Sequence, residues 1–226
     1  MANEPLKADF PMTRYRLAIF DFDGTLVDSL PWFRTSLQET IARFDLAPVS
    51  PEELEAMRGL SARDIMARLK VSTWQLPAIV SDMRKRKLAA AGETPLFAGI
   101  PAMLADLQRL GIELAIVSSD SEASVRLVLG PTASLITRFD CGAAVFGKHW
   151  KFRRVARKLG AKATEAICIG DEIRDIEAAD AAGMDSGAVA WGYALPAALQ
   201  SAGPTHFFKS IDEITQRLAS THNTQP

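Results

Sequence analysis

The 226-residue sequence lacks the features that define several protein classes. No run approaches ~18 consecutive apolar residues, so we expect no membrane span, and the opening MANEPLKADFPM predicts neither signal peptide nor anchor. Only two cysteines occur, Cys141 and Cys168, and their apolar neighbours favour reduced thiols over a disulfide framework. A formal net charge of -1 gives no reason to expect nucleic acid or an anionic membrane as partner. These absences predict a cytoplasmic protein.

What the sequence does contain, from Gly99 onward, is an alternation of apolar strands with amphipathic helices. A further short apolar strand is predicted near the start of the chain, at 17–20. Strands separated by helices favour an α/β fold, a parallel sheet covered by helices on both faces. The predicted later strands cover 113–117, 141–146, 166–169, 187–191 and 206–208, and the predicted helices cover 100–110, 152–159, 173–182 and 211–218.

Roughly 90 residues separate the first predicted strand from the next, far more than the ~2–6 usual in such folds. This stretch has helical periodicity, and Ser50, Pro51 and Glu53 form a predicted capping box at one helix start. The insertion follows the carboxyl end of a strand, where open α/β sheets bind ligands, and so predicts a helical lid. The predicted division is a core of 13–29 and 94–219, a cap domain of 30–93, and flexible termini at 1–12 and 220–226.

Asp21 and Asp23 follow the first predicted strand in the segment DFDGT. In an extended chain, side chains two residues apart face the same side. Adjacent carboxylates repel each other unless a cation lies between them, and Mg²⁺ prefers oxygen ligands. Gly24 permits a strained turn, and Thr25 brings a hydroxyl to the same loop. The alternative is a metal-free turn that the aspartates cap.

A second acidic pair, Asp171 and Asp175, follows another predicted strand in IGDEIRD. The two residues are one helical turn apart, so both carboxylates can approach one point. Aspartate is also a favoured helix N-cap, which would be a purely structural role. Two acidic clusters at the carboxyl ends of strands favour the metal-binding interpretation.

Hydroxyl and basic residues complete the pattern. Ser118 and Ser119 follow the strand predicted at 113–117, where a hydroxyl and backbone N–H groups can cradle phosphate oxygens. Lys148 or Lys151 in FGKHWKF could offset negative charge on a phosphate and on the aspartates. Either lysine could instead belong to a solvated helix face.

In chain order, DFDGTLVDS, IVSSD, a basic residue and IGDEIRDIEAA resemble the four motifs of the haloacid dehalogenase superfamily, in its phosphatase branch. The resemblance extends from about Tyr15 to Phe208, and the helical insertion is similar to a C1-type cap. It implies a Rossmann-like core, Mg²⁺ as cofactor, and phosphoglycolate phosphatase-like hydrolysis of a small phosphorylated metabolite.

The resemblance also implies catalytic roles. Asp21 would attack phosphorus and form an aspartyl-phosphate. Asp23 would protonate the leaving oxygen and then deprotonate the hydrolytic water. Ser118 and Lys148 would hold the phosphoryl group. Because His149 stands where many relatives carry proline, Lys151 stays an alternative to Lys148.

Metal ligands follow from the same resemblance. Mg²⁺ would be held by the carboxylates of Asp21 and Asp171 and by the backbone carbonyl of Asp23. Asp175 would act as a ligand directly or through water.

The substrate-binding residues implied are less specific. The segment MRGLSARDIM around Gly59 resembles the cap loop that dips toward the site in this family. Arg58 or Arg63 there would bind a carboxylate or second phosphate, which suits phosphoglycolate-like or sugar phosphates, unless both are surface residues. Thr25 and Ser119 are the remaining candidates, although many relatives carry Asn at the position of Ser119.

Other functions stay open at this stage. A phosphomutase would need its aspartyl-phosphate protected from water, and a non-catalytic phosphate-binding protein would be expected to have lost motif residues. A phosphonate-cleaving relative would need a cap lysine. We interpret its candidates, Lys70 and the basic run 84–87, as solvated helix surface.

Overall fold

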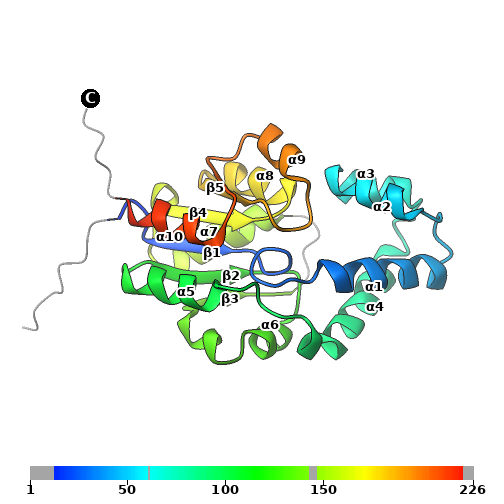
Figure 1. Cartoon of the computed structure of the whole chain (residues 1–226), viewed down its shortest axis with the longest axis horizontal. Coiled ribbons are helices and arrows are strands. Elements are labelled where there is room, and N and C mark those ends of the chain that lie inside the picture. Colours follow the sequence, from blue (N-terminus) through cyan, green and yellow to red (C-terminus); the bar gives the residue numbers. More distant parts are fainter. Residues whose placement is uncertain (1–12, 61, 143–146, 221–226) are drawn as a thin grey trace, which may run out of the picture.

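The computed structural model describes residues 13–60, 62–142 and 147–220. At its centre is a six-stranded parallel sheet with the order β3-β2-β1-β4-β5-β6 (Figure 1). The predicted flexible termini lie outside the described residues, apart from Ser220. The strands are β1 Leu17–Phe20, β2 Glu113–Val117, β3 Arg138–Asp140, β4 Ala166–Gly170, β5 Asp185–Val189 and β6 His206–Phe208.

Helices occupy most of the remaining described chain, and among them none is long and apolar enough to cross a membrane. Between β1 and β2 the chain forms α1 to α4 and then α5, which leads into β2. The helices are α1 Leu30–Arg43, α2 Pro51–Ala56, α3 Ala62–Arg68, α4 Leu76–Ala89, α5 Ile100–Arg109, α6 Glu122–Leu129, α7 Lys148–Lys158, α8 Ile173–Ala182, α9 Pro196–Ser201 and α10 Ile211–Ala219. Short 3₁₀ turns are η1 Met57–Gly59, η2 Ala91–Glu93, η3 Gly130–Leu135 and η4 Ala163–Glu165.

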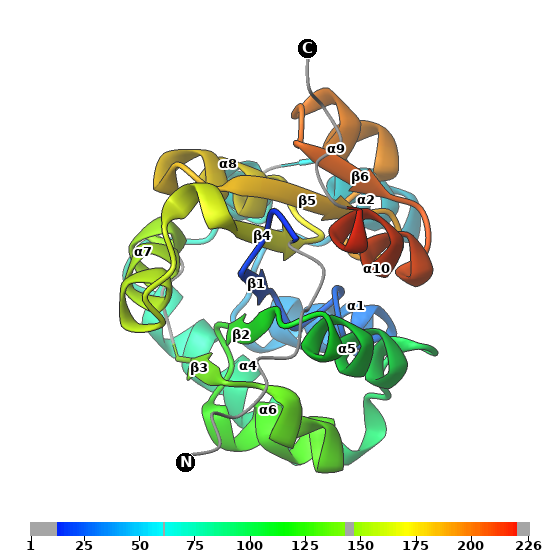
Figure 2. The ribbon, with the colours of Figure 1, turned by 90° about the vertical axis from the view of Figure 1, so that its left-hand side faces the viewer.

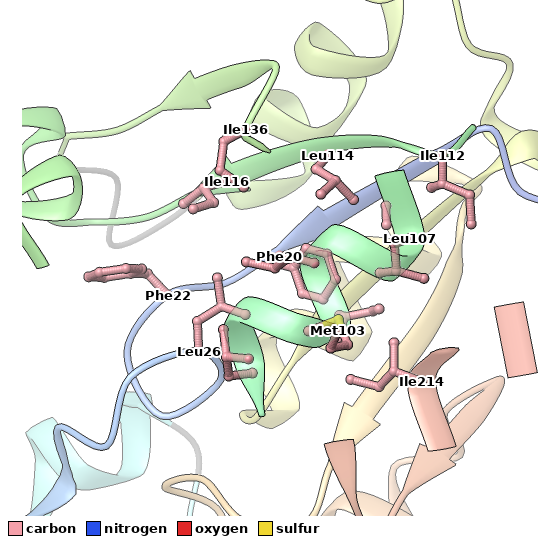
Figure 3. Close-up of a cluster of buried hydrophobic side chains, with 14 of the residues drawn as sticks. Phe20, Phe22, Leu26, Met103, Leu107, Ile112, Leu114, Ile116, Ile136 and Ile214 are labelled. Carbon is pink, nitrogen blue, oxygen red and sulfur yellow. The ribbon is translucent and has the colours of Figure 1, made fainter. Parts of the chain in front are cut away.

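Both faces of the sheet are buried. In β1, Ala18 and Phe20 pack with α5, α6 and α10, while Leu17 and Ile19 pack with α7 and α8. Figure 2 shows these two helical layers on opposite sides of the strands, and Figure 3 shows the cluster around Phe20. Side chains alternate across a strand, so a strand covered on both sides reads as an uninterrupted apolar run such as LAIF. The predicted α/β fold is confirmed.

Two predicted strands differ from the observed ones: the strand predicted at 187–191 begins and ends two residues earlier, as β5, and the strand predicted at 141–146 is wrong in position. The sequence favours 141–146, but β3 covers Arg138–Asp140, and Cys141 and Gly142 lie outside any strand. The rest of that prediction, 143–146, lies outside the described residues. Among the described residues β3 is an edge strand that pairs with β2, and its Asp140 carboxylate accepts two hydrogen bonds from Arg154. A hydrogen bond between residues distant in sequence does not change the spacing of apolar residues from which strands are predicted.

The stretch between β1 and α5 is helical, as predicted, and has an apolar cluster of its own. Figure 1 shows α1–α4 together at one end of the molecule. The segment that leads from β1 into these helices runs beside the segment that leads from them to α5. The Asp28 N–H donates to the Pro95 carbonyl at 2.9 Å, and Val27 forms a β-bridge with Leu96. The division into a core and a cap at 30–93 stays a prediction. The buried residues of the cluster are Leu37, Met57 and Leu69.

Candidate active site

The sequence-predicted residues converge where three neighbouring strands end. β1 lies between β2 and β4, and Asp21, Ser118 and Asp171 directly follow these three strands. The strands are parallel, so their carboxyl ends meet at one edge of the sheet, the usual ligand-binding edge of this fold class. The first turns of α7 and α8 bring Lys148 and Asp175 to the same place.

Three buried carboxylates form the centre of the site. Asp21, Asp171 and Asp175 each present an oxygen, and these atoms all lie within 4.8 Å of one another. Burial, opposed by nearby Lys148, raises the pKa of Asp21 to about 6. Burial also raises the pKa of Asp171, with Glu172 and Asp21 adding to the rise. Three close, desolvated carboxylates that offer only oxygen donors fit a hard divalent cation, which would relieve their mutual repulsion.

Asp171 is oriented by two loops outside its own motif. Its Oδ1 accepts a 2.7 Å hydrogen bond from the Thr25 hydroxyl, and its Oδ2 accepts one of 2.7 Å from the Tyr193 N–H. Two glycines make room for this carboxylate. A Cβ on Gly24, whose φ is +72°, would lie 2.2 Å from Asp171 Oδ2, and one on Gly192 would lie 2.2 Å from Asp171 Cβ. The geometry favours a supporting role for Thr25 over the predicted substrate contact.

Lys148 joins two of the carboxylates. Its Nζ lies 2.9 Å from Asp21 Oδ2 and 2.6 Å from Asp175 Oδ1. Burial lowers the pKa of Lys148, but Asp175 and Asp21 outweigh it and raise the pKa above its ordinary value. For Asp175, burial is likewise outweighed by Lys148 and Arg174, and its pKa lies below the ordinary value. Lys148 therefore keeps its positive charge beside the proposed nucleophile.

Lys151, the alternative basic residue, has different partners. Its Nζ donates to the backbone carbonyls of Gly142 at 2.5 Å and of Ser118 and Asp140 at 3.3 Å. These bonds hold the loops after β2 and β3 together. The geometry thus favours Lys148 as the residue that acts on substrate and gives Lys151 a structural role.

Ser118 and Ser119 lie at the end of β2. Ser118 is buried, and its hydroxyl accepts a 3.0 Å hydrogen bond from the Asp120 N–H. Ser119 is exposed, and its carbonyl accepts a bond from Arg84 of α4. A small cavity lies at this point, and its lining residues are Asp21, Val117, Ser118, Ser119, Lys148, Lys151 and Arg174.

Arg174 is a cavity residue that the sequence reasoning missed. It lies in the first turn of α8, between Asp171 and Asp175 in sequence, and Glu172 pairs with its guanidinium at 2.5 Å. Its Nε is buried and has no hydrogen-bond partner among the described residues. A guanidinium beside Lys148 adds positive charge where a phosphoryl group would lie. Its position inside the acidic motif IGDEIRD could have indicated from the sequence that Arg174 lies at the site.

Asp23 has a partner that was also missed. Its carboxylate forms an ion pair with Lys87 of α4, and the Lys87 side chain is only 4% exposed. The interpretation of the run 84–87 as solvated surface is wrong at this residue. Arg86 is likewise engaged, since it donates to Ser36 and Thr40 of α1.

The loop around Gly59 lies against the core. Arg58 donates to the carbonyls of Tyr193 at 2.7 Å and Gly192 at 3.1 Å, and its own carbonyl accepts from the Leu195 N–H. These contacts favour a docking role for Arg58 over the predicted contact with substrate. Arg63 is exposed on α3, and its assignment, like that of Gly59, stays a prediction.

Comparison with known proteins shows which family and which relatives the chain resembles in sequence and fold. Residues 18–189 match the family model of the haloacid dehalogenase-like hydrolases. A phosphoglycolate phosphatase of Synechococcus elongatus is 28% identical over 202 residues, covering 88% of this chain and 95% of the relative. One from Agrobacterium fabrum is 32% identical over 192 residues, covering 78% and 81%. A haloacid dehalogenase-like hydrolase of Streptococcus pneumoniae superposes with a TM-score of 0.75 at 20% identity, covering 91% of this chain and 99% of that structure.

Proposed function

Because the chain belongs to the haloacid dehalogenase-like hydrolase family, we propose that it is a magnesium-dependent phosphatase of small phosphomonoesters. The family match confirms the predicted family and its enzyme class, a phosphatase-type hydrolase. The observation that carries the proposal is the buried cluster of Asp21, Asp171 and Asp175 with Lys148 bound to it. Relatives named phosphoglycolate phosphatase support a small phosphorylated metabolite as substrate, and a cytoplasmic location is part of the same proposal.

The proposed reaction has two steps. In the first, a carboxylate oxygen of Asp21 forms a bond to phosphorus while the bond from phosphorus to the leaving oxygen breaks. Asp23 gives its proton to that leaving oxygen. In the second step, Asp23 takes a proton from water, whose oxygen attacks phosphorus and releases inorganic phosphate and the free carboxylate of Asp21.

Positively charged groups would hold the phosphoryl oxygens during both steps. Lys148 and Arg174 supply these charges in the cavity, and Ser118 lies beside them with a hydroxyl. Fixed charges in a site closed to water stabilise the transition state more than the same charges in water. Lys148 also restrains Asp21, because it binds one of its two oxygens.

The residues that would hold Mg²⁺ are Asp21 and Asp171, the backbone carbonyl of Asp23, and Asp175 directly or through water. A bound Mg²⁺ neutralises charge on the phosphoryl group and polarises its oxygens. Asp171 is prepared for this role by the hydrogen bonds from Thr25 and Tyr193.

A phosphate-release screen tests the proposal. The purified protein with Mg²⁺ is assayed on phosphoglycolate, sugar phosphates and an aryl phosphate, together with Asp21→Asn and the matched control Asp180→Asn. Asp180 is exposed on α8, so its variant should resemble the wild type. Asp21→Asn should lose several orders of magnitude in rate, on the order of 10⁴ or more, because no phosphoenzyme can form. Equal rates for the three proteins would contradict the proposal.

A further inference from the structure

Lys87 is a buried lysine that no step of the proposed reaction uses. It lies near the end of α4, and its side chain is 4% exposed. Lysine is almost never fully buried unless it is paired, because moving an ammonium out of water is costly. The partner here is the carboxylate of Asp23, 64 residues away in sequence.

The ammonium is held on a second side by an aromatic ring. Lys87 Nζ lies 4.7 Å from the ring centroid of Trp32, at the start of α1, a distance typical of a cation–π interaction. Figure 1 shows α4 beside α1, and Arg86 joins the two helices through Ser36 and Thr40. The flexible lysine chain is therefore restrained, and its head group has a defined place relative to Asp23.

Each of the two aspartates of the first motif forms an ion pair with a different lysine. Lys148, from α7, binds Asp21, whereas Lys87, from the helical insertion, binds Asp23. The Asp23 carboxylate takes no part in the cluster of three metal-binding carboxylates. Its 21% exposed side chain is therefore available to exchange a proton with a leaving oxygen or with water.

We propose that Lys87 is a positioning residue that orients the Asp23 carboxylate for proton transfer. The ammonium binds Oδ1 of Asp23, which restrains rotation of the carboxylate and leaves Oδ2 to exchange the proton. Lys87 belongs to α4, so this orientation exists only while the helical insertion lies against the strand ends. The acid–base group would then be assembled together with the enclosure that excludes water.

This inference rests on the proposed function, and leaving-group dependence tests it. Lys87→Met removes the charge with similar length, Lys87→Arg keeps it, and Lys85→Met on the exposed side of α4 is the matched control. With an alkyl phosphate, Lys87→Met should lower kcat by ~10²-fold, the lower end of general acid–base effects. With an activated aryl phosphate, formation of the phosphoenzyme should stay within about tenfold of wild type, because a good leaving group needs little protonation. KM should change little, and Lys87→Arg should recover part of the loss.

A double-mutant cycle separates positioning from a structural role. If Lys87 acts through Asp23, adding Lys87→Met to Asp23→Asn should cost less than about twofold, because residues that act as a unit are not additive. The inference would be overturned if the two substitutions lowered kcat independently, so that their effects multiplied. It would also be overturned if Lys87→Met slowed phosphoenzyme formation equally with both substrates and lowered the melting temperature. If Lys87→Met fails to fold, Lys87→Gln and Lys87→Arg supply the same comparison.

The two proposals can fail separately. An inactive wild type would overturn the proposed function. An active wild type whose Lys87 variants match it on both substrates would overturn this inference alone.

Discussion

The Thr25 hydroxyl donates a 2.7 Å hydrogen bond to Oδ1 of Asp171, across 146 residues of sequence. The bond joins the loop after β1 to the end of β4. Groups that orient a metal-binding carboxylate in this way commonly matter nearly as much as the ligand itself. Thr25 is therefore expected to act on metal binding.

Replacing Thr25 by valine should weaken Mg²⁺ binding. The shape is kept but the donor to Asp171 is lost, and such losses typically cost ~10–100-fold in metal affinity. Calorimetric titration with Mg²⁺ measures this directly. Thr25→Ser, which keeps the hydroxyl, is the matched control and should bind as the wild type does. An unchanged affinity in Thr25→Val would contradict the role given to this bond.

Removing the metal should abolish activity. Phosphate release should vanish in EDTA and return with excess Mg²⁺, since the three carboxylates would otherwise repel one another and the phosphate. Ca²⁺ should restore little, because its larger and looser coordination suits phosphoryl transfer poorly. Full activity in the chelator would refute the metal assignment.

The two candidate lysines should respond differently to substitution. Lys148→Met should lower kcat by ~10²–10³-fold, as expected when one charged donor is removed from an active site. Lys151→Met should mainly reduce stability, by ~1–3 kcal/mol, because it leaves buried carbonyls without their donor. Chemical denaturation and phosphate release, measured on both variants, check this. The opposite pattern would make Lys151 the catalytic residue.

Asp21 and Asp23 should be separable by trapping the phosphoenzyme. Asp21→Asn should form none. Asp23→Asn should still react with an activated aryl phosphate but hydrolyse the adduct slowly, because general-base help is worth ~10²–10⁴-fold. Acid quench and mass spectrometry would locate the phosphoryl group. An adduct on any residue other than Asp21 refutes the mechanism.

Arg58→Ala should impair every substrate. Its guanidinium binds the carbonyls of Gly192 and Tyr193, in the same loop whose Tyr193 N–H orients Asp171, so its loss should disturb the site itself. We expect kcat/KM to fall about tenfold or more on both phosphoglycolate and an aryl phosphate, as small misplacements can cause. Arg63→Ala provides the comparison: a loss confined to phosphoglycolate would support its predicted substrate contact. A loss confined to phosphoglycolate in Arg58→Ala would restore Arg58 as a substrate ligand.

The positions of β1 and β4 could be read from the sequence because both strands are buried on both faces, whereas the strand predicted at 187–191 is observed two residues earlier, as β5. LAIF and AICI are continuous apolar runs, so the strand predicted at 17–20 matches β1 and the one predicted at 166–169 matches β4 to within one residue, and the aspartates that follow were placed at the strand ends. β3 was misplaced because Arg138 and Asp140 are polar, and the partner of the Asp140 carboxylate, Arg154, comes from α7.

The sequence by itself therefore determined the α/β fold, the helical insertion and the strand-end aspartates, because periodicity and strand ends are local properties of a chain. Only the tertiary structure decided which basic residues form ion pairs with these aspartates. Lys148 and Lys151 are three residues apart in one helix, yet Lys148 binds the carboxylate of the proposed nucleophile, whereas Lys151 donates to backbone carbonyls and lies 3.8 Å from the Asp140 carboxylate. Lys87 belongs to a basic run that looks solvated, and it meets Asp23 only because α4 folds back against the strand ends. An ion pair between distant elements depends on how those elements pack, and no local pattern records it.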